Sequence, residues 1–395
     1  MKILKITANN LPLFNREINI DFITESRVSS DEKHELINIF KNFYLNKVIA
    51  FTGLNASGKT KMLNIINFII NMVNAKYINR DNISNIESNI LNLKLGEETN
   101  FKTYLFVDNY NNEEVIVELN TTISTREDVT GFRTEYFIKD ETLKIKKAKS
   151  VTSKNDLFDF SNKVIETIER TAESIDTVSI IHLLYQRKNV KKIFWANTLL
   201  HTNFNFMNTS AVIPAELIKL LDPSIENVEV SKNTTKVKFI NQETEITTDD
   251  YFELQNILSS GTIKGINIFM RAIQAISNGG ILIIDELENH FNRQIILYFI
   301  NLFKDRTINT KGAILVYSTH YVELLDYIDR NDAIYILNKN KNINLFKLSN
   351  ELKRKDIKKS EQIIKGMISN TSLEYSIANE LKQKIKHIIK EGINN

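Results

Sequence analysis

The sequence of 395 residues contains no cysteine, three prolines and a single tryptophan. Without cysteine the chain forms neither disulfides nor a cysteine-ligated zinc site. This absence fits the reducing environment of the cytoplasm, which is where we expect the protein to act.

Long hydrophobic runs are missing as well. Residues 1–8 contain no apolar region ahead of a small-residue cleavage site, and no later stretch offers about 18 uncharged apolar residues. We therefore expect a protein that is neither secreted nor inserted in a membrane.

A large excess of one charge is also absent. The 51 lysines and arginines nearly balance the 48 acidic residues, and a net charge of +3 is too small to predict nucleic-acid binding for the chain as a whole. Hydrophobic residues at 42% and charged residues at 25% are typical of a soluble globular protein. The length allows two domains, or one domain that carries a large insertion.

Alternating strand and helix patterns predict an α/β fold with a mostly parallel sheet flanked by helices. We expect its two halves at residues 1–75 and 246–350, separated by a large α+β insertion at 76–245 and followed by a helical tail at 351–395.

The predicted strands of the two halves are 3–6, 18–22, 47–52, 281–284 and 313–317, with a hairpin at 333–348. The predicted helices are 60–73, a stretch that opens at Gly261, and 294–303. In the insertion we expect strands at 104–107, 115–119, 136–138, 228–230 and 237–240, and helices at 162–173 and 177–186.

Residues 53–60, Gly-Leu-Asn-Ala-Ser-Gly-Lys-Thr, fit the P-loop pattern and lie between a buried strand and a helix, as the mechanism requires. The glycines let the backbone curl so that consecutive N–H groups surround phosphate oxygens. Lys59 adds a positive charge over the β- and γ-phosphates of ATP, and the Thr60 hydroxyl is a ligand for Mg²⁺. The predicted nucleotide-binding residues of this segment are Gly53, Asn55, Ala56, Ser57, Gly58, Lys59, Thr60 and Lys61.

A second segment, residues 281–286, reads Ile-Leu-Ile-Ile-Asp-Glu and predicts a buried strand that ends in two carboxylates. Ligands bind at the carboxyl ends of the strands in open α/β sheets. We expect Asp285 to hold Mg²⁺ through water and Glu286 to orient or deprotonate the attacking water, as a Walker B pair does.

Two further segments complete the predicted site. A Ser-Ser-Gly turn at Ser259, Ser260 and Gly261 opens a helix, whose N-terminus can contact a phosphate. The P-loop of the same chain already holds its own nucleotide, so this turn is expected to contact the nucleotide of a second copy. The predicted strand 314–319 ends at His320, which can reach the γ-phosphate and report its presence.

Taken in order, these four segments resemble the ABC-type ATPases of the SMC and RecF-like branch. More narrowly, the sequence resembles the AAA-family ATPases of bacterial abortive-infection and other anti-phage systems, including relatives of the overcoming-lysogenisation-defect proteins. The matching residues are 55–60, 258–262 and 332–339, so the resemblance covers the two halves of the head but not the insertion or the tail. It implies an ATPase that uses ATP and Mg²⁺ and acts as a homodimer or larger homo-oligomer.

The sequence departs from these families at two places. After the Asp-Glu pair they often carry a His-Leu-His-Pro-like turn, whereas residues 290–293 here are His-Phe-Asn-Arg, so that only His290 is kept. Relatives that fuse a TOPRIM nuclease to the head place it after the switch histidine, but residues 321–395 hold a predicted hairpin and a lysine-rich helix. The effector is therefore expected to be a separate protein, a nuclease or a toxin.

Other patterns remain open. Basic clusters at residues 144–149, 187–192 and 354–359 could touch nucleic acid, although a solvated face is the simpler interpretation. Trp195, with Ile193 and Phe194, is more typical of core than of a base-stacking platform. The sequence does not identify the glutamine of a Q-loop; Gln186 is a possible residue, but no pattern supports it.

The functional hypothesis that follows is a sensor or regulator ATPase of an anti-phage defence system. The alternative is a RecF-like or SMC-like ATPase that acts directly on DNA in repair or maintenance. The nucleotide-binding cassette of a membrane transporter is disfavoured by the long insertion and by the Ser-Ser-Gly-Thr segment.

Overall fold

A parallel sheet of hydrophobic strands forms the centre of the fold in the computed structural model, which describes residues 1–78, 90–128, 134–186, 190–199, 213–230, 234–249, 253–354, 357–366 and 375–391. Its strand order is β10-β14-β15-β5-β16-β17, and only the last pair is antiparallel. The bounds are β5 (Val48–Thr52), β10 (Trp195–Asn197), β14 (Ile281–Ile284), β15 (Ile314–Thr319), β16 (Ile334–Lys339) and β17 (Ile343–Lys347). The chain thus has the α/β fold of a P-loop NTPase.

The strands of this sheet are buried on both faces because their side chains alternate between two hydrophobic cores. In β5, Ile49 and Phe51 pack into one core, while Val48 and Ala50 pack into the other. The continuous apolar runs that predicted these strands are therefore the consequence of a sheet covered on each side.

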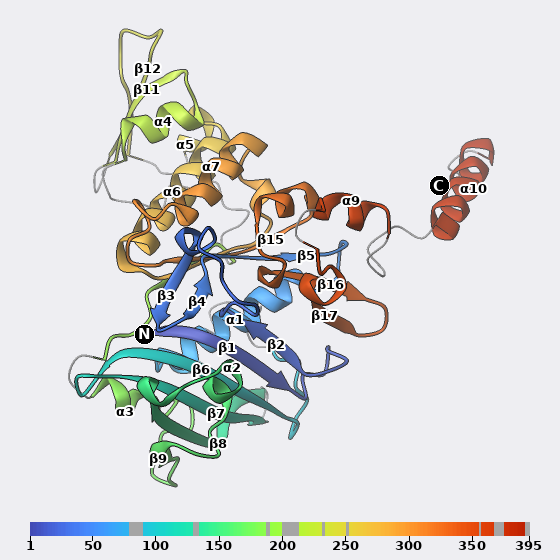
Figure 1. Cartoon of the computed structure of the whole chain (residues 1–395). Helices are drawn as coiled ribbons and strands as arrows, with labels where there is room; N and C mark the ends of the chain where they lie inside the picture. Colours follow the sequence, from blue (N-terminus) through green and yellow to red (C-terminus); the bar gives the residue numbers. More distant parts are fainter. Residues whose placement is uncertain are drawn as a thin grey trace.

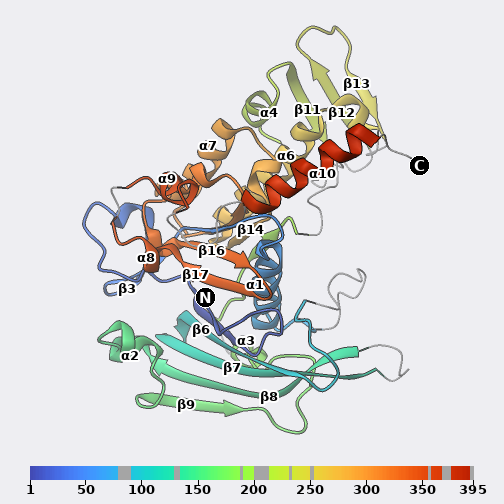
Figure 2. The same ribbon diagram turned by 90° about the vertical axis from the view of Figure 1, so that its right-hand side faces the viewer.

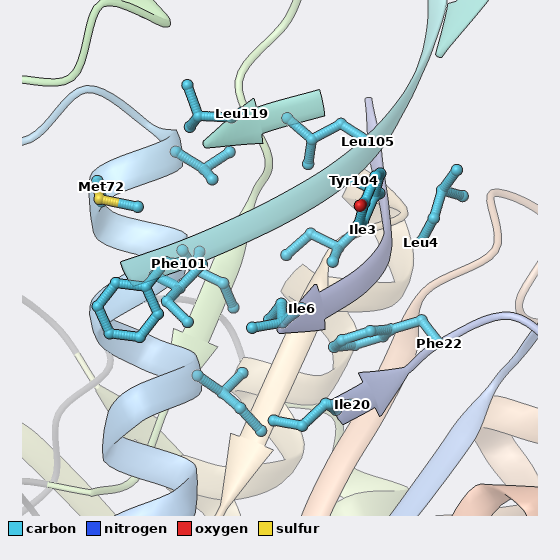
Figure 3. Close-up of a cluster of buried hydrophobic side chains, with 14 of the residues drawn as sticks. Ile3, Leu4, Ile6, Ile20, Phe22, Met72, Phe101, Tyr104, Leu105 and Leu119 are labelled. Carbon is cyan, nitrogen blue, oxygen red and sulfur yellow. The ribbon is translucent and has the colours of Figure 1, made fainter. Parts of the chain in front are cut away.

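Helix α1 (Lys59–Val73) covers one face and is itself enclosed between two sheets. Figures 1 and 2 show α1 between the parallel sheet above it and the antiparallel sheet below it. This position explains why the helix is apolar nearly all round, since almost every side of it contacts a strand. The close-up in Figure 3 shows Met72 of α1 facing Phe101 and Leu105 of the antiparallel sheet.

The antiparallel sheet has the order β2-β1-β6-β7-β8-β9. Its bounds are β1 (Lys2–Asn9), β2 (Ile18–Asp21), β6 (Glu98–Tyr110), β7 (Glu113–Glu127), β8 (Thr134–Lys147) and β9 (Val164–Glu169). The first two strands of the chain therefore join strands of the predicted insertion in one sheet. Conversely, β10 belongs to the insertion in sequence and to the parallel sheet in space. The boundaries of the insertion at residues 76 and 245 stay a proposal.

Helices α6 (Ser260–Asn278) and α7 (Arg293–Lys304) cover the opposite face of the parallel sheet (Figure 1). A small antiparallel sheet and helix α4 lie beyond them, and Gly265 of α6 meets Leu221 at the end of α4. The bounds here are α4 (Ala215–Leu221), α5 (Leu254–Ile257), β11 (Ile225–Val230), β12 (Thr235–Phe239) and β13 (Ile246–Thr248).

The remaining elements are short or peripheral. They are β3 (Leu36–Phe40), β4 (Phe43–Asn46), α2 (Lys154–Phe158), α3 (His182–Tyr185), α8 (Leu348–Glu351), α9 (Lys359–Ile364) and α10 (Tyr375–Glu391), with 3-10 helices at Lys33–Glu35, Ala148–Ser150, Leu287–Asn289, Val322–Tyr327 and Asn331–Ala333. Figure 1 shows α10 apart from the body of the molecule. None of the helices within the described residues combines the length and the apolar character that crossing a bilayer requires.

Most of the predicted strands and helices are confirmed, but the helix predicted at 162–173 is wrong, and the one predicted at 177–186 is confirmed over four residues only. Residues 162–173 contain strand β9, an edge strand whose residues alternate between half-buried and exposed. Its β-branched residues, Val164, Ile165, Thr167 and Ile168, favour a strand and outweigh its helix-forming glutamates. Of the stretch 177–186, only His182–Tyr185 is an α-helix.

The end of α1 is tied to the start of the strand β10. The Asn74 side chain donates to the Ile193 carbonyl at 2.9 Å and accepts from the Ile193 amide at 2.9 Å. Asn74 is almost completely buried at 1% exposure. This pair of bonds fixes the chain two residues before it enters the parallel sheet.

Candidate functional site

Four parallel strands end at one edge of the central sheet, and the residues that follow them form the candidate site. Strand β5 leads into the P-loop, β14 into Asp285 and Glu286, and β15 into His320. Strand β10 ends at the same edge and is followed by Thr198. The fold thus assembles groups that lie far apart in the sequence at the position where open α/β sheets bind ligands.

The P-loop backbone turns sharply at two glycines. Gly53 has a φ of +150°, and a Cβ there would lie 2.1 Å from the Leu337 carbonyl oxygen, so no side chain fits. Gly58 has a φ of +100° and forms the N-cap of α1. The loop therefore curls over the N-terminus of α1, where the first amides have no partner within the helix and can bind phosphate oxygens.

Three residues between these glycines were predicted to contact the nucleotide. Asn55 and Ala56 are exposed, and Ala56 has a positive φ of 59° that extends the curl of the loop. Ser57 is buried, and its hydroxyl has no hydrogen-bond partner among the described residues.

Lys59 lies at the centre of the site. Its ammonium donates to the carbonyls of Gly53 at 2.9 Å and Leu54 at 3.1 Å, and it lies 3.2 Å from Nδ1 of His320. Burial lowers the pKa of Lys59 to about 8, against the carboxylates of Glu286, Asp285 and Glu288, which raise it. The lysine is thus a partly buried cation surrounded by carbonyl and carboxylate oxygens.

Thr60 and Asp285 bring two oxygen ligands together. The Thr60 hydroxyl donates to Oδ2 of Asp285 at 2.7 Å, and Ser318 donates to Oδ1 of the same carboxylate at 2.5 Å. Hydroxyl and carboxylate oxygens are the ligands that Mg²⁺ prefers. Within the described residues, no group of three or more histidine, cysteine or acidic side chains could hold a metal ion. The donor set present therefore fits Mg²⁺ that is also coordinated by phosphate oxygens.

Glu286 has an unusual backbone, with φ 49° and ψ 66° in the left-handed region. For a residue with a side chain this conformation costs about 1–3 kcal/mol and occurs most often at functional sites. The Ser318 hydroxyl accepts from the Glu286 amide at 2.8 Å, and Asn289 donates to the Glu286 carboxylate at 2.5 Å. These contacts hold the carboxylate at the edge of the sheet in a half-buried position.

His320 bridges the lysine and the glutamate. An ammonium can only donate, so Nδ1 must accept from Lys59, and the proton of the neutral ring then resides on Nε2. This Nε2 lies 3.4 Å from Oε1 of Glu286. Lys59, His320 and Glu286 therefore form a continuous chain of polar contacts from the P-loop to the end of β14.

The Ser-Ser-Gly segment lies at the N-terminus of α6. Ser259 is the N-cap, and its hydroxyl accepts from the Thr262 amide at 3.0 Å. Ser259, Ser260 and Gly261 are all exposed, and a Cβ on Gly261 would meet only the Ser259 hydroxyl, at 3.7 Å. The segment is thus open to solvent, as a contact with a second molecule requires.

Residues 48–326, from the start of β5 into the 3-10 helix after His320, match a family described as "AAA domain, putative AbiEii toxin, Type IV TA system". The chain belongs to this AAA domain family. The match includes the P-loop, Asp285, Glu286 and His320, and it makes the chain a P-loop ATPase in the general sense. A comparison with curated proteins gave no match.

Lys61 also faces a polar partner in this AAA domain. Its ammonium donates to Oδ1 of Asn92 at 2.5 Å, and burial lowers its pKa to about 8. Asn92 lies in the segment before β6, so this bond connects the first turn of α1 to the segment that leads into the antiparallel sheet.

Several residues of the site were not predicted from sequence. Ser318 and Thr198 hold the backbone and carboxylate of Asp285, with Thr198 accepting from the Asp285 amide at 3.3 Å. Glu288 accepts a hydrogen bond from the His320 amide. His290, which the resemblance singles out, is buried, and its Nε2 lies 3.3 Å from the Asp285 carbonyl oxygen. Ser318, Glu288 and His290 lie within or next to the predicted motifs, but Thr198 lies next to none of them, and no residue pattern indicates these contacts.

Gln186 does not lie at the site. It follows α3, whose Tyr185 hydroxyl donates to the Val73 carbonyl at 2.7 Å, at the far end of α1 from the P-loop. A helix of 15 residues spans about 22 Å at 1.5 Å per residue. The interpretation of Gln186 as a Q-loop residue is therefore wrong. Trp195 is half-buried and packs against the core, and its Nε1 donates to Asn67 of α1 at 3.2 Å.

Proposed function

We propose that the protein binds ATP with Mg²⁺ and hydrolyses it when two copies close around the nucleotide. The observation that carries this proposal is the convergence of Lys59, Thr60, Asp285, Glu286 and His320 at one edge of the sheet. In this proposal Lys59 and the P-loop amides hold the phosphates, and Thr60 and Asp285 hold the metal ion. The head is thereby assigned to the ABC-type branch of P-loop ATPases.

Glu286 is the group proposed to orient or deprotonate the attacking water. Phosphate oxygens compete with the Gly53 and Leu54 carbonyls and with His320 for the ammonium of Lys59. When Lys59 turns to the phosphates, His320 loses its partner on Nδ1, and the imidazole can then respond to the γ-phosphate. The contact between His320 and Glu286 carries this response to the catalytic carboxylate.

The exposed N-terminus of α6 supports the proposed pairing of two copies. Ser260 and Gly261 would contact the nucleotide of the twin, so that ATP itself joins the two subunits. Larger homo-oligomers can be built from such pairs.

The experiment that tests this arrangement measures molecular mass by light scattering, with and without Mg-ATP, for the wild type, Gly261→Ala and Gly261→Trp. Open space surrounds Gly261, so both variants should fold. We expect ATP to double the mass of the wild type and the alanine variant but not that of the tryptophan variant, which should still bind a fluorescent ATP analogue. Association of Gly261→Trp like the wild type would refute the contact in trans.

Nucleotide binding is tested in the same samples, with Lys59→Ala as the control that lacks the phosphate-binding cation. A wild type that binds the fluorescent analogue no better than Lys59→Ala would overturn the proposal of an ATPase altogether.

We further propose that the ATPase is a sensor or regulator in anti-phage defence that controls a separate effector, a nuclease or a toxin. The support is the family description, which names a toxin of a toxin–antitoxin system and therefore a system of more than one protein. Co-purification with the products of neighbouring genes, followed by a phage challenge with and without them, tests this proposal. Full protection by this chain alone would argue against a separate effector.

A RecF-like or SMC-like ATPase that acts on DNA directly is the second candidate, but the basic clusters give it little support. Lys146 is completely buried and donates to the backbone at Asp159, while Lys147 and Lys149 both pair with Glu113. Lys146 is therefore not accessible to a phosphate backbone, and the charges of Lys147 and Lys149 are partly offset by Glu113. Clusters 187–192 and 354–359 lie partly outside the described residues.

A further inference from the structure

Glu288 is an acidic residue at the candidate site that the proposed chemistry does not use. It lies in the 3-10 helix Leu287–Asn289, two residues after Glu286. Its Oε1 accepts a hydrogen bond from the backbone amide of His320, where β15 ends. The contact therefore ties the segment after the Walker B pair to the residue that carries the switch imidazole.

The second carboxylate oxygen of Glu288 lowers the stability of the folded state. Oε2 is buried and has no hydrogen-bond partner among the described residues. A buried carboxylate oxygen without a partner destabilises the folded state, and an uncharged side chain of similar size would avoid that cost. The unpaired oxygen therefore offsets part of the stabilisation that the hydrogen bond from the His320 amide provides.

The surroundings of Glu288 are those of the reaction centre. Its charge is one of the three carboxylate charges that raise the pKa of Lys59 against the effect of burial. Burial, and after it the charge of Glu288, raises the pKa of Tyr317, whose buried hydroxyl has no partner within the part of the chain that the structure describes. Glu288 thus acts on the cation of the P-loop through its charge and on His320 through a hydrogen bond.

We propose that Glu288 is a positioning residue for His320: it fixes the end of β15 so that the imidazole lies between Lys59 and Glu286. This inference rests on the proposed ATPase function. If the hydrogen bond is lost, the His320 backbone can move, and both contacts of the ring, at 3.2 Å and 3.4 Å, become loose. ATP binding should persist, because the P-loop and Lys59 remain in place.

The experiment compares the wild type with Glu288→Ala, Glu288→Gln and the control Glu323→Ala, which removes an exposed glutamate in the next 3-10 helix. We expect Glu288→Ala to lower kcat by about 10–100-fold, the range typical of residues that orient an active-site group, with little change in the affinity for ATP. Glu288→Gln keeps a carbonyl oxygen for the His320 amide, so it should recover most of the rate.

Thermal unfolding separates positioning from a structural role. Because Oε2 is unpaired, Glu288→Ala should not lose stability in proportion to its loss of rate. An unchanged kcat per folded molecule, or a melting temperature that falls together with the rate in both Glu288 variants, would refute the proposal.

A measurement that does not depend on ATP hydrolysis tests this inference separately from the proposed function. The imidazole NMR signals of His320, assigned through His320→Gln among the six histidines, should shift in Glu288→Ala but not in Glu323→Ala. An unchanged His320 signal overturns the positioning role, whether or not the wild type hydrolyses ATP. A wild type that binds no ATP but shows the shift overturns only the ATPase.

Discussion

Glu141 and Glu288 both extend a carboxylate into the protein, but their surroundings are opposite. Glu141, on β8 of the antiparallel sheet, is 1% exposed and accepts hydrogen bonds from Thr121, Ser179, Arg170 and the Ile180 amide. Glu288, at the carboxyl edge of the parallel sheet, has one oxygen bonded and the other without a partner among the described residues.

This difference separates a region built for stability from a region built for chemistry. In the antiparallel sheet both oxygens of the buried Glu141 carboxylate accept hydrogen bonds, as buried acceptors in folded proteins normally do. The carboxyl edge of the parallel sheet instead holds a strained Glu286, an unpaired carboxylate oxygen and a lysine whose pKa is lowered by burial. Substitutions in the two regions should therefore affect different measurements.

The largest effect is expected for Glu286→Gln at the carboxyl edge. The amide cannot take a proton from water, so kcat should fall by roughly 10²–10⁴-fold, the usual contribution of a general base. The affinity for ATP should stay close to that of the wild type, and the ATP-bound pair should become long-lived. Steady-state hydrolysis and a fluorescent-nucleotide titration measure both quantities, and normal turnover would remove Glu286 from this role.

Next in size is Glu141→Ala in the antiparallel sheet. The substitution leaves Arg170, a buried cation at 6% side-chain exposure, without its ion-pair partner. Breaking a buried pair in this way costs about 3–5 kcal/mol of folding free energy, which urea unfolding measures.

The rate of hydrolysis per folded molecule should not change in Glu141→Ala, because the residue lies on the other sheet. The exposed substitution Glu127→Ala on the neighbouring strand serves as the control. If the free energy of unfolding of Glu141→Ala stays within about 1 kcal/mol of the wild-type value, the hydrogen bonds and the ion pair of Glu141 do not stabilise this sheet.

A smaller effect, which depends on pH, is expected at His290. Burial lowers its pKa from 6.5 to about 4, so the folded protein keeps the ring neutral where the unfolded chain binds a proton. The unfolded state thus binds more protons between these values, and stability is lost as the pH falls from about 6.5 to about 4. At 1.36 kcal/mol per unit, the loss reaches about 3 kcal/mol.

His290→Asn should remove this part of the pH dependence, whereas His34→Asn, at an exposed histidine, should keep it. Urea unfolding of the three proteins at pH 7 and pH 4.5 makes the comparison. Equal losses of stability in the wild type and in His290→Asn would show that burial does not hold this ring neutral.

The sequence predicted the parallel sheet and its motifs well because each depends on neighbours in the chain. A short apolar run followed by a glycine or by Asp-Glu indicates a buried strand that ends at a site, and β5, β14 and β15 follow this pattern. The P-loop geometry is equally local, since Gly53 and Gly58 set it.

What the sequence did not predict depends on contacts between distant segments. Strand β10 has three residues and is recognised as part of the parallel sheet only through its pairing with β14. Strand β9 has helix-forming glutamates but lies at the edge of a sheet whose other strands dictate its conformation. Ser318, Thr198 and Glu288 act on residues that are local to another strand, so no pattern within their own segment marks them.

The two hydrogen bonds between Asn74 and Ile193 connect the C-terminal end of α1 to the segment that leads into β10. Thr60, in the first turn of α1, is hydrogen-bonded to Asp285, and Asn74 follows the last turn of the same helix. From Ile193 the chain continues through β10 to Thr198, which is hydrogen-bonded to the Asp285 amide. A displacement of α1 would therefore be transmitted to Asp285 along two paths, directly through Thr60 and indirectly through Asn74, Ile193, β10 and Thr198. A substitution such as Asn74→Ala would remove both bonds and allow Asp285 to shift, although no residue of the candidate site is changed.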